Sequence, residues 1–207
     1  MQGRGWRGDA AALLSALCTF LLSAFLLSAC ATLPRPAPAP VAWAQRLATL
    51  QAIGQFELQG RLAAATATEG FSAGLRWHQQ DDHASIDLSA PLGFGAAHIE
   101  QSATNLQLTT SKGQVLDSTA ASDELRATLG FEPPLSSLRF WILGASDPKS
   151  FAQESVDTEQ RLAHLEQDGW QVDYADYVLV QQQWLPQRLS VTRGALRLRV
   201  VIDHWQL

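Results

Sequence analysis

Hydrophobic and polar residues alternate along much of this chain, and the alternation starts at Phe56 and Leu58. Successive side chains of a strand point to opposite faces, so a period of two predicts strands with one buried face. The pattern recurs in residues 56–62, 71–77, 84–90, 96–101, 105–110, 161–167, 170–174, 178–182, 188–192 and 196–205. Short strands at this spacing predict an antiparallel meander, with Asp81 and Asp82 in one of its turns.

Three other segments have the spacing of helices. Residues 41–53 place Leu47, Leu50 and Ile53 on one face and are followed by Gly54, which can end a helix. Residues 119–129 and 135–143 form two further predicted helices, with two prolines between them. The chain is therefore predicted to be mainly β, with helical pieces inserted into the meander.

The predicted helix over 135–143 has an apolar face formed by Leu135, Leu138, Trp141 and Ile142. A helix of this kind can cover the interior of a curled sheet as a lid. It can equally pack in an ordinary core, and the pattern leaves both interpretations open.

The first thirty residues have the pattern of an export signal. Arg4 and Arg7 precede an apolar run that is too short to span a bilayer comfortably, and small residues lead up to Cys30. The arrangement resembles a bacterial lipoprotein signal, which implies that Cys30 is acylated and becomes the mature N-terminus. An ordinary secretory signal with a chance cysteine is the alternative. We predict a signal peptide over 1–29, a lipidated Pro/Ala tether over 30–40 and a single domain over 41–207.

Charge and chemistry exclude several classes of function. The net charge of −5 becomes −6 without residues 1–29, which argues against binding to nucleic acid. The only two cysteines are Cys18, in the predicted signal, and Cys30, so we expect no disulfide and no cysteine metal site. The five histidines have no metal-ligand spacing, and no nucleophile motif is present. We therefore expect no catalytic residue, no metal and no enzyme.

Several landmarks, in this order and spacing, resemble the LolB family of outer-membrane lipoproteins. They run from the Cys30 signal to Leu207 and cover nearly the whole mature chain. They are Gly60-Arg61-Leu62, Trp77, Pro91-Leu92-Gly93, the Leu-x-x-Leu-x-x-Trp-Ile-Leu-Gly pattern over 135–144, Gly169-Trp170, Tyr174 and Trp205. The long Pro/Ala tether and the extended positively charged start depart from the family.

The resemblance implies a half-open antiparallel β-barrel with a helical lid that encloses an apolar cavity. It also implies the function of accepting lipoproteins from the periplasmic carrier LolA and placing them in the outer membrane, without a cofactor. The expected partners are LolA, the acyl chains of lipoprotein cargo and outer-membrane phospholipid, and we expect a monomer. Ala31 after the cysteine favours the outer membrane, where the chain would be lipid-anchored and face the periplasm.

Two sets of site residues follow. The resemblance places an exposed leucine at the position of Leu92, so we predict that Leu92, with Phe94 beside it, contacts the membrane. A leucine tucked against its own hairpin is the alternative. Apolar residues at alternate positions are predicted to line the acyl-chain cavity, and they are Leu58, Leu62, Leu75, Trp77, Ile86, Leu88, Leu106, Leu108, Leu138, Trp141, Ile142, Trp170, Val172, Leu198 and Val200.

Two other classes of function stay open at this point. One is a non-catalytic envelope lipoprotein that binds another lipid or scaffolds an outer-membrane complex. The other is a periplasmic hydrolase, which would need histidine, serine and carboxylate side chains to converge in the fold.

Overall fold

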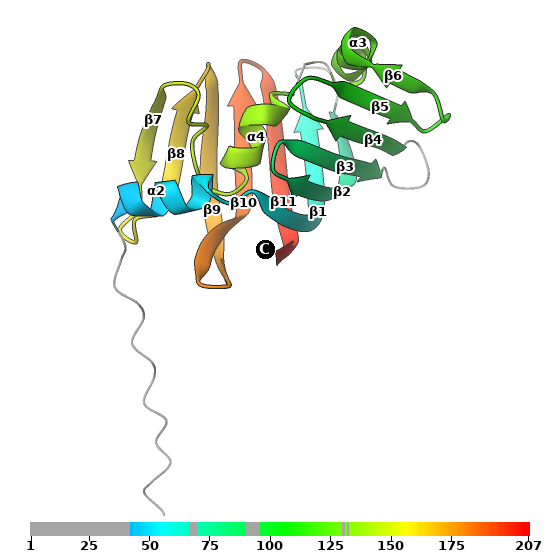
Figure 1. Ribbon diagram of the computed structural model, residues 1–207. Coiled ribbons are helices and arrows are strands. Elements are labelled where there is room, and N and C mark those ends of the chain that lie inside the picture. Colours follow the sequence, from blue (N-terminus) through cyan, green and yellow to red (C-terminus); the bar gives the residue numbers. More distant parts are fainter. Residues whose placement is uncertain (1–41, 67–69, 90–95, 130, 132) are drawn as a thin grey trace, which may run out of the picture. The chain divides into compact units, whose positions relative to one another are not determined.

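The computed structural model describes residues 42–66, 70–89, 96–129, 131 and 133–207. The predicted signal peptide and tether lie outside these residues. Eleven antiparallel strands form one sheet in the order β6-β5-β4-β3-β2-β1-β11-β10-β9-β8-β7. The sheet is strongly curved but not closed, because β6 and β7 are its two edges (Figure 1). This confirms the predicted half-open architecture and the antiparallel meander.

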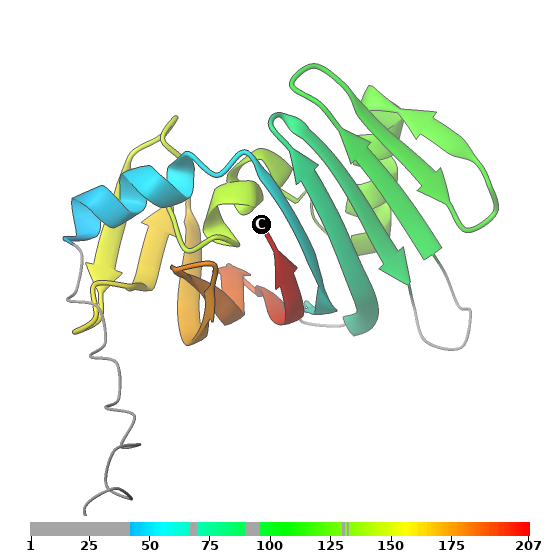
Figure 2. The same ribbon diagram turned by 60° about the horizontal axis from the view of Figure 1, so that its bottom comes forward.

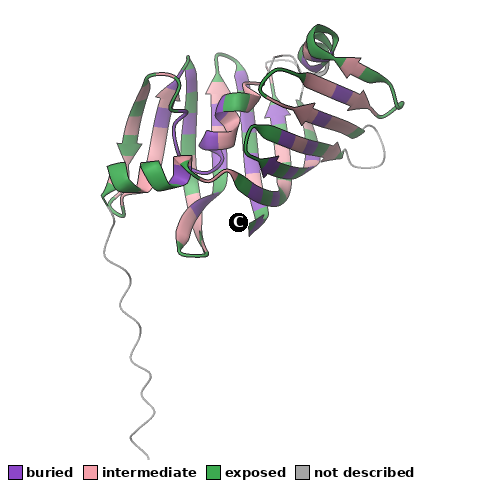
Figure 3. Ribbon diagram, in the orientation of Figure 1, coloured by how far each residue is buried: buried purple, intermediate pink, exposed green. Residues whose placement is uncertain are grey.

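The strands of the first half are β1 (Gln55–Ala65), β2 (Gly70–Gln80), β3 (His83–Ser89), β4 (Ala96–Gln101), β5 (Leu106–Thr110) and β6 (Val115–Asp117). Those of the second half are β7 (Ala152–Val156), β8 (Leu162–Gln167), β9 (Trp170–Val180), β10 (Gln183–Arg193) and β11 (Leu196–Gln206). Buried and exposed residues alternate along them, which gives the banded strands of Figure 3. The inner bands form the core.

Three helices accompany the sheet: α2 (Trp43–Gln51), α3 (Ser118–Leu129) and α4 (Leu135–Trp141). Two views place α4 against the concave face of the sheet (Figures 1 and 2). The helix α3 packs on β5 and β6. Hydrogen bonds from Trp43 Nε1 to Glu154 Oε2 (2.6 Å) and from Arg46 Nη2 to the Trp184 carbonyl (2.6 Å) hold α2 against the second half of the sheet. None of the described helices is long and apolar enough to cross a membrane.

The strand predictions need two corrections. The edge strands β6 and β7 were not predicted, because they are short and neither shows a regular alternation of apolar residues. Residues 170–174 and 178–182 were predicted as separate strands, whereas β9 runs without a break over Trp170–Val180. Its pairing with β10 shifts register near Arg188, which disturbs the alternation that the prediction used.

Candidate functional site

An apolar pocket lies between α4 and the concave face of the sheet. The sheet contributes side chains from six strands, β1 to β4, β10 and β11, and the cavity volume is about 70 Å³. Every lining residue is apolar, and the set is Leu62, Phe71, Leu75, Trp77, Ile86, Leu88, Ile99, Phe131, Pro133, Leu135, Leu138, Ile142, Leu189, Val191, Leu198 and Val200. A concave apolar surface of this kind is suited to a hydrophobic ligand.

The helix α4 forms the roof of the pocket with Leu135, Leu138 and Ile142. Their spacing of three and four residues places them on one helix face, as the sequence predicts. Phe131 and Pro133 extend the roof on the N-terminal side of α4.

A buried polar network fixes the C-terminal end of α4. The Trp141 indole Nε1 donates to Gln167 Oε1 (2.8 Å), which also accepts a hydrogen bond from the Asp147 backbone N–H (2.9 Å). Ser137 Oγ donates to Asp147 Oδ2 (3.0 Å), and Gln167 is only 2% exposed. Because a buried polar group without a partner is costly, these bonds hold this end of the helix in one position.

The hydroxyl of Tyr174 adds a further contact to the same end, since it donates to the Trp141 carbonyl (2.9 Å). Burial raises the pKa of Tyr174 well above its ordinary value. The tyrosine therefore remains a neutral hydrogen-bond donor at physiological pH.

A second network joins α4 to the turn between β2 and β3. Arg139 Nη1 donates to the Asp81 carbonyl (2.6 Å) and lies 3.0 Å from Asp82 Oδ1. Gln79 Nε2 donates to the same Asp81 carbonyl (2.7 Å) and receives the Trp77 indole N–H on its Oε1 (2.9 Å). The roof of the pocket and its wall residue Trp77 are thus connected through one backbone carbonyl.

The lining is more exposed on one side of the pocket than on the other. Six of its large apolar residues are only partly buried: Leu62, Phe71, Leu88, Phe131, Leu135 and Leu138. Leu88 is the penultimate residue of β3, which ends at Ser89. The accessible side of the pocket therefore includes the end of β3 and the N-terminal part of α4.

The structure brings together nine of the fifteen residues that the sequence predicts for the cavity. These are Leu62, Leu75, Trp77, Ile86, Leu88, Leu138, Ile142, Leu198 and Val200. Whether they bind acyl chains stays a prediction.

The other six predicted residues lie outside this pocket. Leu58 is buried between Trp77 and Trp205 in the strand register, and Val172 lies between Leu165 and Val191. Leu106 and Leu108 are on β5, where α3 packs. Trp141 and Trp170 contact each other, with ring centroids 6.2 Å apart. These six side chains pack in or against the core outside the pocket, and Trp141 does so from the C-terminal end of α4.

Seven lining residues were not on the predicted list: Phe71, Ile99, Phe131, Pro133, Leu135, Leu189 and Val191. Five of them follow the alternation of their strand or the apolar face of α4, so the periodicity of the sequence could have identified them as lining residues. Phe131 and Pro133 lie in a connection whose path no periodicity predicts. The predicted residues Cys30, Leu92 and Phe94 are outside the part of the chain that the structure describes, and their roles stay predictions.

Four histidines lie near carboxylates on the outer face of the sheet. His98 Nδ1 is 2.8 Å from Asp87 Oδ1, and His164 Nδ1 is 2.7 Å from Asp173 Oδ1. These hydrogen bonds raise the pKa of both histidines above 6.5. The remaining two pairs are His78 with Glu57 (2.9 Å) and His83 with Glu100 (2.7 Å). In the described residues, no group of three or more His, Cys, Asp or Glu side chains is arranged to hold a metal ion.

Solved structures share this fold. A LolA superfamily protein from Nitrosomonas europaea matches with a TM-score of 0.51, 9% identity and coverage of 81% of this chain and 94% of that chain. A putative outer membrane lipoprotein-sorting protein domain from Vibrio parahaemolyticus matches with the same TM-score of 0.51, at 10% identity, and the match covers 79% of this chain and 90% of that chain. This chain therefore shares its fold with these two proteins.

Sequence comparison is more specific. The family model described as "Outer membrane lipoprotein LolB" matches residues 54–205. The outer-membrane lipoprotein LolB of Nitrosococcus oceani is 36% identical over 92% of this chain and 97% of its own length. The outer-membrane lipoprotein LolB of Alkalilimnicola ehrlichii is 36% identical over 90% of this chain and 94% of its own length.

The chain belongs to the LolB family of outer-membrane lipoproteins, which confirms the predicted family. This family is not enzymatic, and its members are lipid-anchored in the outer membrane and face the periplasm. The predicted localisation and the prediction that the chain is not an enzyme are confirmed by this membership. A role in lipoprotein localisation is consistent with it.

Proposed function

We propose that this protein accepts lipoproteins from the periplasmic carrier LolA, binds their acyl chains between α4 and the sheet, and inserts them into the outer membrane. The observation that carries the proposal is the wholly apolar lining of the pocket, with six large side chains left partly exposed. Exposed apolar surface is unfavourable in water, and acyl chains would cover it. We further propose that the protein acts as a monomer anchored through Cys30, with Leu92 and Phe94 contacting phospholipid.

The pocket has to widen to hold an acyl chain. Its volume of about 70 Å³ is well below the roughly 300–1,000 Å³ of typical ligand pockets. Phe131, Pro133 and the N-terminal part of α4 form its partly exposed roof. We propose that this part of the roof moves outward when cargo enters.

Transfer needs no nucleotide if each step is downhill. About 1.4 kcal/mol of extra affinity shifts an equilibrium tenfold. Each methylene that leaves water contributes roughly 0.8 kcal/mol, so two more buried methylenes than in the carrier would suffice. The membrane, which buries the whole chain, is then the final acceptor.

The proposal is tested by transfer of a labelled lipoprotein from LolA to the chain with Cys30 replaced by alanine, followed by addition of liposomes. We expect label to move to the chain and then to lipid. In Leu88→Gln, a polar amide enters the pocket lining, and we expect uptake to fall about fivefold or more, since burying an unpaired amide costs roughly 1–3 kcal/mol.

Leu106→Gln is the matched control, because Leu106 is also a half-buried strand leucine but does not line the pocket. Its uptake should be close to that of the parent. Equal uptake by folded Leu88→Gln and Leu106→Gln would refute binding in this pocket. No transfer to the folded parent from a competent carrier would favour a lipid-binding or scaffolding lipoprotein.

A further inference from the structure

The hairpin formed by β9 and β10 extends beyond the strands on either side of it (Figures 1 and 2). Backbone pairing of β9 with β8 ends at Asp173, and pairing of β10 with β11 begins at Arg188. Between these points, within the described residues, the two strands pair only with each other. Residues 177–187, which we call the hairpin extension, therefore form a two-stranded ribbon without a neighbouring strand.

The hairpin extension contains no charged residue. Its sequence is Tyr-Val-Leu-Val-Gln-Gln-Gln-Trp-Leu-Pro-Gln, and the charges that flank it in sequence, Asp176 and Arg188, pair with each other at its base (3.1 Å). Leu179 is 52% exposed, and its register partner Trp184 is partly buried. A two-stranded ribbon is marginally stable in water, and exposed apolar side chains are unfavourable there. The extension therefore presents apolar surface that a less polar environment would stabilise.

A groove beside the hairpin extension adds to this surface. It lies between the extension and the end of β11, has a volume of about 260 Å³, and is lined by Val178, Leu179, Val180, Gln187, Ile202, Asp203, His204 and Trp205. Five of these eight residues are apolar. The carboxylate of Asp203 is paired with Arg61 (3.0 Å), which offsets its charge.

The hairpin extension lies next to the point where the tether joins the domain. Arg46, in the first turn of α2, donates from Nη2 to the Trp184 carbonyl (2.6 Å). With the lipid anchor at Cys30, residues 31–42 link the membrane to α2 and can span at most roughly 40 Å. The extension is therefore beside the attachment of the tether, where the tether gives the bilayer surface a high local concentration.

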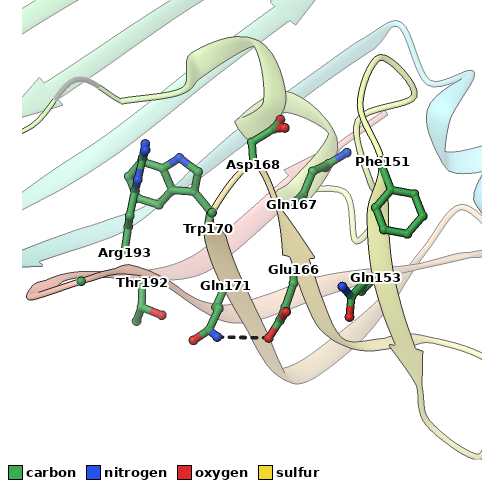
Figure 4. Close-up of a pocket in the computed structure, with 11 residues that line it drawn as sticks. Phe151, Gln153, Glu166, Gln167, Asp168, Trp170, Gln171, Thr192 and Arg193 are labelled. Atoms are coloured by element: carbon green, nitrogen blue, oxygen red, sulfur yellow. Dashed lines mark hydrogen bonds between the residues drawn. The ribbon is translucent and has the colours of Figure 1, made fainter.

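The opposite rim of the same strands is polar. A groove of about 400 Å³ lies there, at the turns from β8 to β9 and from β10 to β11, and its lining includes Glu166, Asp168 and Gln171 (Figure 4). The Gln171 amide donates to Glu166 Oε1 (3.1 Å). Phe151 is 82% exposed, but it shares this lining with both carboxylates. Because burying charged groups against lipid is costly, the apolar hairpin extension is the better membrane contact of the two rims.

We propose that the hairpin extension docks in the phospholipid interface of the outer membrane, with Leu179, Val178 and Val180 in contact with lipid. Trp184, opposite Leu179, suits the level of the headgroups, where tryptophan is enriched in membrane proteins. Membership of an outer-membrane family places a phospholipid surface next to the protein. The inference rests on that location and does not depend on whether the protein carries acyl chains.

This contact turns the accessible side of the apolar pocket away from the bilayer. Each strand from β9 to β3 in the sheet order is antiparallel to the next, so β3 ends on the rim opposite to the hairpin extension. The accessible side of the pocket includes that end of β3. The docked protein thus holds its pocket toward the periplasm, and a membrane contact through Leu92 requires a second orientation.

The test uses the full lipidated chain in phosphatidylcholine vesicles, with a fluorophore on a single introduced cysteine. Acylation of Cys30 leaves the mature chain no other thiol. The label is attached to Gln182→Cys, in the exposed turn of the hairpin extension, or to Gln171→Cys, at the other end of β9. We expect lipids with brominated acyl chains to quench the label at position 182 and to leave the label at position 171 unquenched. The quenched fraction at position 182 gives the docking equilibrium constant.

Leu179→Ala should lower that constant about fivefold, given the usual contribution of the exposed half of a leucine side chain, and Leu179→Asp about tenfold or more. The matched control is Val115→Asp, because Val115 is also an exposed strand residue (55% against 52%) but lies on the edge strand β6. We expect the control to change docking less than about threefold.

A label at position 182 that brominated lipid does not quench in the folded parent would overturn the proposal. Equal losses in Leu179→Asp and Val115→Asp would also overturn it, in favour of a general effect of added charge. If the label were shielded from water only after LolA is added, the hairpin extension would be a protein contact instead. Uptake of labelled lipoprotein by Leu179→Asp is measured separately, so this proposal and the proposed carriage of acyl chains can fail independently.

Discussion

Replacing Gln167 by methionine should remove the polar network that fixes α4. Gln167 Oε1 accepts hydrogen bonds from the Trp141 indole and the Asp147 N–H, and its Nε2 donates to the carbonyls of Asp147 (2.8 Å) and Ser150 (3.0 Å). Methionine is also unbranched and of similar length, but its thioether is at best a weak acceptor. The variant therefore deletes four hydrogen bonds with little change in shape.

The magnitude follows from the groups that lose a partner. The Trp141 indole N–H and the N–H and carbonyl of Asp147 belong to buried residues, whereas Ser150 is partly exposed and its carbonyl can bond to water. Each buried group left unpaired costs roughly 1–3 kcal/mol, and burial of the more apolar thioether offsets part of that cost. We expect a net loss of about 3 kcal/mol in the free energy of unfolding, or about 6–12 °C in Tm for a domain of this size.

Urea unfolding of Gln167→Met and its parent, followed by circular dichroism, measures this loss. The m value should stay constant, so that the shift in midpoint reports stability. The control is Gln171→Met, since Gln171 is exposed and its side chain donates only to Glu166 Oε1 (3.1 Å). It should remain within about 0.5 kcal/mol of the parent. A loss below 1 kcal/mol for Gln167→Met would refute the idea that this network anchors α4.

Two further predictions concern the sheet. Gly60 lies at the register shift between β1 and β11, where an added Cβ would collide with the Val201 carbonyl. We therefore expect Gly60→Ala to lower the free energy of unfolding by about 1–3 kcal/mol. An unchanged Tm would contradict this. For His98 and His164, the folded pKa is raised above the unfolded value of about 6.5, so their stabilisation is complete below pH 6.5 and is lost as the pH rises through the folded pKa. Urea unfolding at a series of pH values should show that decline, and His98→Gln with His164→Gln should flatten it.

The sequence predicted the regular strands well because alternation directly reports which face is buried. Along β2, Ala73, Leu75 and Trp77 are buried, as their period of two requires. The same alternation could not reveal the edge strand β6, because all three of its residues, Val115–Asp117, are partly or fully exposed. An edge strand pairs on one side only and need not bury a face, so backbone pairing defines it more than side-chain pattern does.

The cavity was predicted only in part for a different reason. Periodicity assigns Leu58 and Leu62 to the same inner face of β1, but only Leu62 lines the pocket. A cavity is the space that packed side chains leave unfilled, and here its extent depends on where α4 crosses the sheet. That crossing is determined by contacts distant in sequence, such as Trp141 with Gln167 and Arg139 with Asp81.

The two ends of α4 differ in what it costs to move them, and this indicates how the pocket can open. Displacing Trp141 would break its buried hydrogen bond to Gln167, an expensive loss. Displacing Phe131 and Leu135 would expose apolar side chains that are already partly exposed, and an incoming acyl chain would cover them again, whereas Ser137, further along the helix, is held by its buried hydrogen bond to Asp147. The lid and core-packing interpretations of this helix are therefore compatible, because its C-terminal end packs as core and its N-terminal end can act as the lid.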